Sequence, residues 1–202
     1  LCEQSGASMI HVHCRDEQER PTSRYEIFKD TVARIRKRTK LIVMTSTSGI
    51  AGATDEERAE PLGTQPEMAS LTSGSLNFAG RTPSIVYVNT PETVQFLAKR
   101  MLESGIKSEI EAFDVGFIAQ GKKLIEMDLV REPTHFQLMM GVDGGIPATP
   151  ENLFHMRSQL PPNATYVVAG MSRMQLPMTT TAILMGGHVR VGLEDNLYLR
   201  KG

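Results

Sequence analysis

The chain has 202 residues, and its 22 Lys and Arg against 23 Asp and Glu give a formal net charge of -1. This balance, without any basic run, argues against nucleic acid and anionic membrane surfaces as partners. Two cysteines are too few for a disulfide framework, and no apolar stretch reaches the ~18 residues of a membrane-spanning helix. The composition therefore predicts a soluble, cytoplasmic protein.

Short apolar segments alternate with amphipathic stretches of helical length along the chain. In chain order, we predict strands at residues 8–13, 41–46, 68–71, 107–113, 135–141, 165–170 and 188–194. The helices predicted between them cover residues 24–38, 91–104, 118–128, 149–160 and 177–185. This alternation is typical of repeated βα units that build a parallel sheet.

Seven strands in this rhythm fit either an open doubly wound sheet or a closed eight-stranded barrel. An open sheet that binds a dinucleotide needs a glycine fingerprint after its first strand, and none follows residues 8–13. The pattern also starts and stops abruptly at Leu1 and Gly202. We therefore predict one partial (β/α)8 TIM-barrel catalytic domain over residues 1–202, without its first strand and helix and without its C-terminal helices.

Three of the predicted strands alternate apolar and polar residues, although parallel strands buried on both faces are normally apolar throughout. The polar residues are His11 and His13 in the first strand, Glu109 and Glu111 in the fourth, and Arg190 and Glu194 in the last. Because side chains alternate with period two, each set shares one face. Buried charges cost several kcal/mol unless they are paired or bind a metal, so the three strands predict a shared site.

His11 and His13 end their strand, and the C-terminal ends of the strands carry the active sites of barrel enzymes. Two imidazoles and one carboxylate form a known catalytic metal set, and Glu194 is the natural third ligand. The alternative for an isolated His-x-His pair is two ordinary core histidines, but the polar residues on the other strands favour a metal. The same alternation turns Cys14 away from His13, which predicts a buried thiol.

Other polar residues at predicted strand ends are candidates for substrate contacts. Glu111 is a candidate acid or base, or a residue that orients a metal ligand. Ser46, the Ser48-Gly49 turn and Ser70 close the second and third strands. Their hydroxyl and backbone N–H groups could hold a carboxylate.

Two segments carry a family resemblance: residues 7–16, which read Ala-Ser-Met-Ile-His-Val-His-Cys-Arg-Asp, and residues 186–196, which read Gly-Gly-His-Val-Arg-Val-Gly-Leu-Glu-Asp-Asn. With supporting segments at residues 66–71, 74–78 and 108–114, the chain resembles the β-keto acid cleavage enzymes, zinc-dependent barrels that include 3-keto-5-aminohexanoate cleavage enzyme. The resemblance extends over nearly the whole chain. Ser48 departs from it, because a glycine is usual at that position.

The resemblance implies a set of roles for individual residues. Zinc would bind His11, His13 and Glu194; Ser46, Gly49 and Ser70 would contact the substrate; Glu111 would have a polar role; and Arg190 and Asp195 would do the acid/base work. The implied reaction converts a β-keto acid and acetyl-CoA into acetoacetate and a new acyl-CoA. The family also implies a homo-oligomer, often a tetramer.

The residues suit this chemistry, since a metal can polarise the keto carbonyl and Asp195 beside Arg190 can remove the acidified α-proton. Two alternatives stay open. One is a metal-dependent hydrolase with a His-x-His barrel site, although such sites usually take further histidines from later strands. The other is a truncated barrel that binds metal without catalysis.

Overall fold

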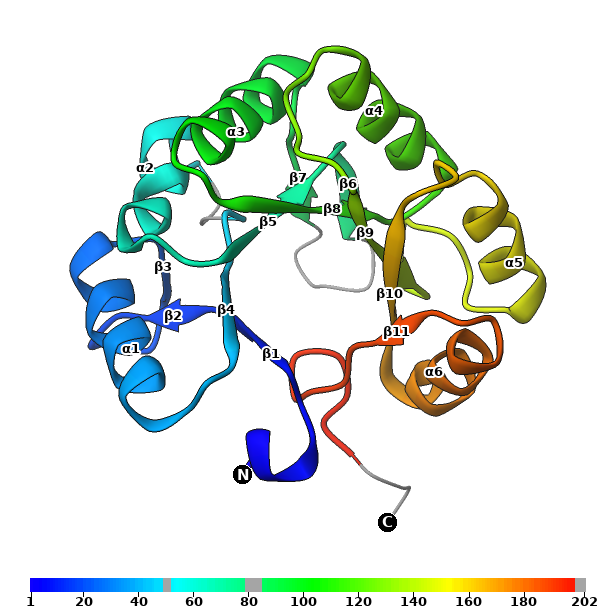
Figure 1. Cartoon of the computed structure of the whole chain (residues 1–202), viewed down its shortest axis with the longest axis horizontal. Helices are drawn as coiled ribbons and strands as arrows, with labels where there is room; N and C mark the ends of the chain where they lie inside the picture. Colours follow the sequence, from blue (N-terminus) through cyan, green and yellow to red (C-terminus); the bar gives the residue numbers. More distant parts are fainter. Residues whose placement is uncertain (49–51, 79–84, 199–202) are drawn as a thin grey trace. The chain divides into compact units, whose positions relative to one another are not determined.

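The computed structural model describes residues 1–48, 52–78 and 85–198. Its main sheet has seven strands in the order β1-β4-β5-β8-β9-β10-β11. They are β1 (Met9–Val12), β4 (Ile42–Thr45), β5 (Met68–Thr72), β8 (Lys107–Ala112), β9 (His135–Met140), β10 (Thr165–Gly170) and β11 (His188–Val189) (Figure 1). The pairs β1/β4, β4/β5, β9/β10 and β10/β11 are parallel. The α/β class and the seven strands predicted from the sequence are thus confirmed.

Helices follow most of these strands in the chain. They are α1 (Tyr25–Arg38), α2 (Asp55–Ala59), α3 (Pro91–Glu103), α4 (Val115–Glu126), α5 (Pro150–Ser158) and α6 (Gln175–Leu184). Two small antiparallel sheets join β2 (Cys14–Arg15) to β3 (Pro21–Thr22) and β6 (Leu76–Phe78) to β7 (Ile85–Tyr87). The sequence analysis predicted neither these hairpins nor α2, and none of the described helices is long and apolar enough to cross a membrane.

The start of α4 was predicted three residues too late, at residue 118. The Asp114 side chain accepts a hydrogen bond of 2.7 Å from the backbone N–H of Gly116, so the helix begins at Val115. An aspartate at this position satisfies one of the free N–H groups of the first turn. The capping residue Asp114 marks the start of the helix in the sequence, whereas the hydrophobic pattern alone does not.

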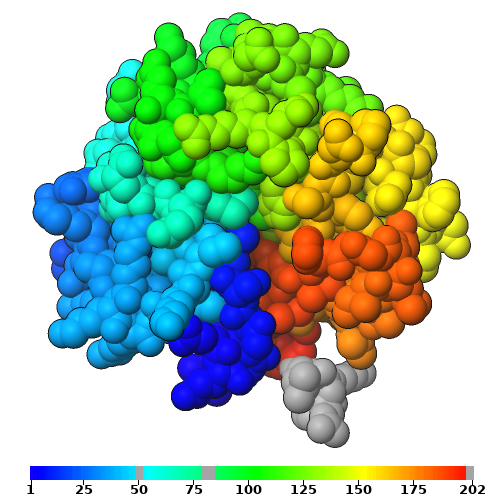
Figure 2. All heavy atoms as spheres, viewed as in Figure 1, coloured from blue at the N-terminus to red at the C-terminus, as the bar shows by residue number. Residues whose placement is uncertain are grey.

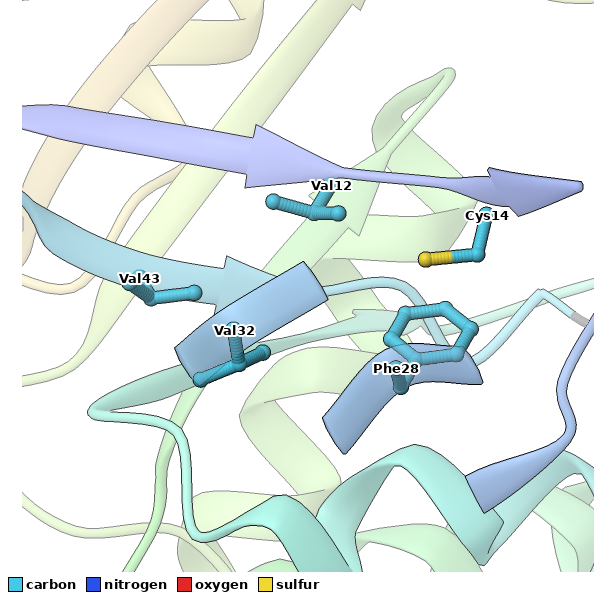
Figure 3. Packing of buried hydrophobic residues seen from close by; sticks show 5 residues of the cluster. All are labelled: Val12, Cys14, Phe28, Val32 and Val43. Atoms are coloured by element: carbon cyan, nitrogen blue, oxygen red, sulfur yellow. The ribbon is translucent and has the colours of Figure 1, made fainter. Parts of the chain in front are cut away.

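The chain divides into two compact units. The first comprises Leu1–Leu71, Glu92–Glu109 and Asp128–Arg131, and the second comprises Thr72–Pro91, Ile110–Met127 and Glu132–Gly202. In the first unit, α1 packs its apolar face on β1 and β4 (Figure 3). The cluster consists of Val12, Cys14, Phe28, Val32 and Val43. Because Val12 faces this core, the alternation of β1 turns its histidine neighbours to the other face.

Cys14 is buried in this core, as predicted, and its thiol donates a hydrogen bond of 3.6 Å to the Thr31 hydroxyl. Burial raises the pKa of Cys14, and the contact with Thr31 offsets only part of this effect. The thiol is therefore a packing group of the first unit. A metal-binding role for it receives no support from its orientation.

Glu67, directly before β5, holds the start of β4 in the first unit. One carboxylate oxygen accepts from the Val43 N–H at 3.0 Å, and the other accepts from the Arg36 guanidinium at 3.0 Å. Partial burial raises the pKa of Glu67, but the backbone N–H groups and Arg36 outweigh burial, so the pKa lies below its usual value.

The second unit is built on the parallel pair β9 and β10, whose register runs from His135 opposite Thr165 to Met140 opposite Gly170. α6 packs against β10 and beside α5 (Figure 1). The side chains of α5 and α6, yellow to orange, form a continuous surface in the space-filling view (Figure 2). In this unit α6 thus packs against β10, and α5 packs against β9.

Candidate active site

An imidazole pair marks the end of β1 in the first unit. The Nε2 atoms of His11 and His13 lie 2.9 Å apart, and the ring planes are inclined by 75°. Two nitrogens that bind one tetrahedral zinc ion at ~2.0–2.1 Å are about 3.3 Å apart, so a small opening of the pair would fit one ion. The distance between the two nitrogens is therefore compatible with one shared ion, and the metal-ligand role of the pair stays a prediction.

A group of hydroxyls closes β4 and β5 in the same unit. The Ser46 hydroxyl lies 2.7 Å from the Ser48 hydroxyl and accepts from the Ser48 N–H at 3.1 Å. Thr47 donates its hydroxyl hydrogen to the Ser70 carbonyl at 2.7 Å. The structure thus brings Ser46 and Ser70, both predicted to contact substrate, to neighbouring strand ends; Gly49, the third such residue, lies outside the described residues.

Arg58 on α2 supports this group from behind. Its side chain is buried, and Nε donates to the Thr47 carbonyl at 3.0 Å. The guanidinium thereby holds the backbone between Ser46 and Ser48 in a fixed conformation. The sequence analysis missed Arg58 because it did not predict the short helix that carries it.

The second unit carries a charged cluster around Arg190, which directly follows β11. Its Nε and Nη2 donate to the two carboxylate oxygens of Asp195 at 3.0 and 2.9 Å. Nη2 also lies 2.7 Å from a carboxylate oxygen of Glu194. The side chain of Asp195 is only 1% exposed and that of Arg190 12%, so this bidentate pair is largely withdrawn from water.

The chain turn after Arg190 places both carboxylates. The Gly192 carbonyl accepts from the N–H groups of Asp195 and Asn196 at 3.1 and 3.0 Å. The Asp195 carbonyl in turn accepts from the Ser172 N–H at 2.8 Å, which ties the turn to the segment after β10. The backbone thus holds Asp195 independently of its side chain.

Electrostatics keep Arg190 protonated. Burial lowers its pKa, but the negative charges of Glu194, Asp195 and Glu111 and the hydrogen bonds to Asp195 more than offset burial. The pKa of Arg190 therefore lies above its already high ordinary value. A permanent positive charge beside Asp195 favours the ionised carboxylate.

Glu111 on β8 belongs to the same unit and is buried. The Thr72 hydroxyl at the end of β5 donates to a Glu111 carboxylate oxygen at 2.5 Å. Asn89 Nδ2 donates to the Thr72 carbonyl at 2.8 Å. This chain of contacts fixes the Glu111 side chain, and Glu109 two residues earlier on the same strand is also buried, as the alternation predicted.

A sequence model described as beta-keto acid cleavage enzyme matches residues 1–202. The chain belongs to the beta-keto acid cleavage enzyme family. It is similar to the 3-keto-5-aminohexanoate cleavage enzyme of Acetoanaerobium sticklandii, with 42% identity over 199 residues, 98% of this chain and 72% of that protein. It is also similar to the 3-oxoadipate:acetyl-CoA acetyltransferase of Cupriavidus necator, with 39% identity over 202 residues, 98% of this chain and 69% of that protein.

Among solved structures, the apo structure of ObcA matches with a TM-score of 0.83 and 20% sequence identity. The match covers 98% of this chain and 53% of that chain, so the chain spans about half the length of ObcA. At this identity the match shows a shared fold. The resemblance to β-keto acid cleavage enzymes that the sequence predicted is confirmed by the family match, and the chain is an enzyme of this kind.

One strand prediction in this family member needs correction. The last strand, predicted over residues 188–194, ends at Val189. The Arg190 N–H still donates to the Val168 carbonyl of β10, and the chain then turns at Gly192, whose carbonyl accepts from the N–H groups of Asp195 and Asn196. Val191 and Leu193, the apolar residues that alternate with Arg190 and Glu194 in the predicted strand, are 64% and 77% exposed. Glu194 and Asp195 therefore lie on a turn and not on a strand face.

Gln137 on β9 is a further polar residue of the second unit that the sequence analysis missed. Its Oε1 accepts from Arg190 Nη1 at 3.3 Å, and the side chain is fully buried. The signal was present, because Gln137 is the single polar residue between Phe136 and Met140 in an otherwise apolar segment. An interior amide in such a strand indicates a specific partner.

Proposed function

We propose that this protein is a zinc-dependent β-keto acid cleavage enzyme. It would convert a β-keto acid and acetyl-CoA into acetoacetate and a new acyl-CoA. The observation that carries the proposal is the buried, bidentate Arg190–Asp195 pair beside Glu111, because it provides a carboxylate held ready to exchange a proton next to a fixed positive charge. The name of the similar 3-oxoadipate:acetyl-CoA acetyltransferase of Cupriavidus necator supports acetyl-CoA as the co-substrate.

The proposal includes a (β/α)8 TIM-barrel catalytic domain over residues 1–202. The seven strands in barrel-like chain order and the fold shared with ObcA support it. In such barrels the C-terminal strand ends carry the site residues, and His11, Ser70 and Glu111 each lie at or near such an end. The cytoplasmic location and the homo-oligomeric, tetrameric state stay predictions.

We propose His11, His13 and Glu194 as the zinc ligands. Support comes from the short distance between the two Nε2 atoms and from the ligand chemistry, since two imidazoles and a carboxylate leave positions open for substrate. When bound, zinc supplies a Lewis acid for the keto and carboxylate oxygens of the substrate. Glu194 lies in a salt bridge with Arg190, and a carboxylate binds a metal in its ionised form.

Asp195 would act as the base that takes the proton from the carbon between the keto and carboxylate groups. Arg190 holds both oxygens of Asp195 and stays protonated throughout, so it orients the base and stabilises the negative charge that develops on the substrate. Ser46 and Ser70 would donate hydroxyl hydrogens to the substrate carboxylate. Glu111, fixed by Thr72, would help to keep Arg190 in place through its negative charge.

The carbon that has lost its proton would attack the thioester carbonyl of acetyl-CoA, forming a carbon–carbon bond and expelling the CoA thiolate. The thiolate then adds to the original keto carbon of the same adduct. Breaking the bond between that carbon and the former α-carbon yields the new acyl-CoA and the acetoacetate carbanion. Asp195 returns its proton to this carbanion, so the residues finish the cycle unchanged.

The test is acetoacetate formation by zinc-loaded protein from a panel of β-keto acids, with and without acetyl-CoA. The panel varies the group beyond the keto carbon: amino, carboxylate, trimethylammonium or alkyl. Product that requires acetyl-CoA supports the proposal, and the preferred acid identifies the substrate. Consumption of the β-keto acid without acetyl-CoA and without acetoacetate favours the metal-dependent hydrolase. No product from folded, zinc-bearing protein with any member would favour the non-catalytic barrel.

A further inference from the structure

Gln137 is the one neutral side chain bound to Arg190 among the described residues of the second unit. It is 0% exposed and lies on β9, whereas the carboxylates that bind Arg190 come from the turn after β11. Gln137 lies opposite Val167 of β10, and β10 separates β9 from β11, which Arg190 follows. A residue 53 positions earlier in the chain thus reaches the proposed acid/base pair.

The orientation of the Gln137 amide follows from the chemistry of its partner. A guanidinium only donates hydrogen bonds, so the amide oxygen must face Arg190. The amide nitrogen then faces the other way, and it has no hydrogen-bond partner within the part of the chain that the structure describes. A buried donor without an acceptor destabilises a fold, and an apolar side chain of the same length would avoid that loss.

The three guanidinium nitrogens of Arg190 divide their contacts. Nε and Nη2 face Asp195, Nη2 also faces Glu194, and Nη1 faces Gln137. Glu194 and Asp195 therefore compete for one edge of the guanidinium. The hydrogen bond on the remaining nitrogen, Nη1, fixes the rotation of the planar guanidinium. This rotation decides whether both carboxylate oxygens of Asp195 accept hydrogen bonds from Arg190.

We propose that Gln137 is a positioning residue that locks the guanidinium plane of Arg190 side-on to Asp195. It acts through Arg190 and does not touch the substrate. This inference rests on the proposed function, in which Asp195 is the base. It explains why a buried amide occupies a strand position that packing alone would give to an apolar residue.

The first test is the kinetics of Gln137→Met, which keeps the length of the side chain and removes the acceptor. We expect kcat to fall by about 10- to 100-fold, because misplacing a reacting group costs that much, while KM changes less than about threefold.

The control is Leu138→Ala, at the next position of β9, which is buried and points to the opposite face. It should lower the melting temperature and leave kcat within about threefold below that temperature. An unchanged kcat in Gln137→Met would overturn the inference, as would an equal loss of kcat in the control.

The second test does not depend on activity. Crystal structures of the wild type and Gln137→Met should show the Arg190 guanidinium rotated, with one of its two hydrogen bonds to Asp195 lost in the variant. An unchanged bidentate pair would overturn the inference. If wild-type protein transfers no acyl group on the whole panel, the proposed function fails, yet this structural comparison still decides whether Gln137 holds Arg190.

Discussion

The two units contribute different kinds of groups to the proposed site. The first unit offers neutral donor groups: two imidazoles at the end of β1, and hydroxyls at the ends of β4 and β5. The second unit offers charges: one guanidinium surrounded by three carboxylates, with Gln137 and Thr72 holding it and Glu111 in place. Neutral donors suit the binding of a cation and a substrate, whereas a buried ion pair suits the transfer of a proton.

The same difference predicts how strongly each unit responds to mutation. Removing one partner of a buried ion pair leaves an uncompensated charge, which costs about 3–5 kcal/mol. Removing one hydroxyl from a partly hydrated turn loses a hydrogen bond worth about 0.5–1.5 kcal/mol. We therefore expect the largest effects in the second unit and smaller effects from the hydroxyls of the first.

The largest effect is expected for Asp195→Asn. The amide keeps the shape of the side chain but cannot take a proton, so turnover should fall by about 10²–10⁴-fold while zinc remains bound. Acetoacetate formation and zinc content, measured on the same preparation, test both statements. Asp128→Asn is the matched control, because Asp128 is exposed and its φ of 56° is a conformation that Asn also adopts. Normal turnover in Asp195→Asn would remove this residue from the mechanism.

Glu194→Ala should separate metal binding from proton transfer. Loss of a residue that only hydrogen-bonds a metal ligand lowers metal affinity by ~10–100-fold. Loss of the proposed ligand Glu194 itself should lower zinc affinity by more than that, and activity should fall in proportion. His13→Ala in the first unit should have the same effect, and the exposed Glu126→Ala none. Calorimetric titration with zinc measures all three variants. Wild-type affinity in Glu194→Ala would refute the ligand role and confine metal binding to the first unit.

Ser46→Ala tests the neutral half of the comparison. The change removes one hydroxyl from the turn with Ser48 and one proposed donor to the substrate carboxylate, so KM should rise by about 3- to 10-fold with kcat nearly unchanged. Ser104→Ala, after α3 in the same unit, is the control. A drop in kcat as large as that of Asp195→Asn would break the division between binding and proton transfer.

The sequence predicted most of the fold because the βα rhythm is local. Each strand of the main sheet from residue 8 to residue 170 lies within a few residues of its predicted position, since hydrophobic runs between helical patterns mark these strands directly. The last strand was overestimated because alternation continues through Val191 and Leu193, and only the pairing partner on β10 decides where a strand ends. Period two alone does not encode that partner.

The site was less fully predictable. The pair His11 and His13 is visible in the sequence because the two residues are two positions apart. Gln137 and Arg58 are not, since each acts on a residue far along the chain or from a helix too short to give a clear pattern. Contacts of this kind depend on packing, which a single sequence shows only as an isolated polar residue in an apolar strand.

The smallest expected effect concerns Glu67, a carboxylate with a structural role in the first unit. Glu67→Gln weakens the contacts with Val43 and Arg36, and because Glu67 is 48% exposed at its side chain, the loss should be at most about 1 kcal/mol. For a protein of this size that lowers the melting temperature by roughly 2–4 °C at pH 7.

The lowered pKa of Glu67 means that its stabilisation is present above the pKa of the unfolded chain, ~4.3, and is lost as the pH falls through the folded value. The difference between wild type and variant should therefore shrink below about pH 4, whereas Glu103→Gln, on the exposed end of α3, should show no such trend. Turnover of Glu67→Gln at pH 7 should match the wild type. A large loss of turnover would show that a charge in the first unit also serves the reaction, and the comparison between the units would then fail.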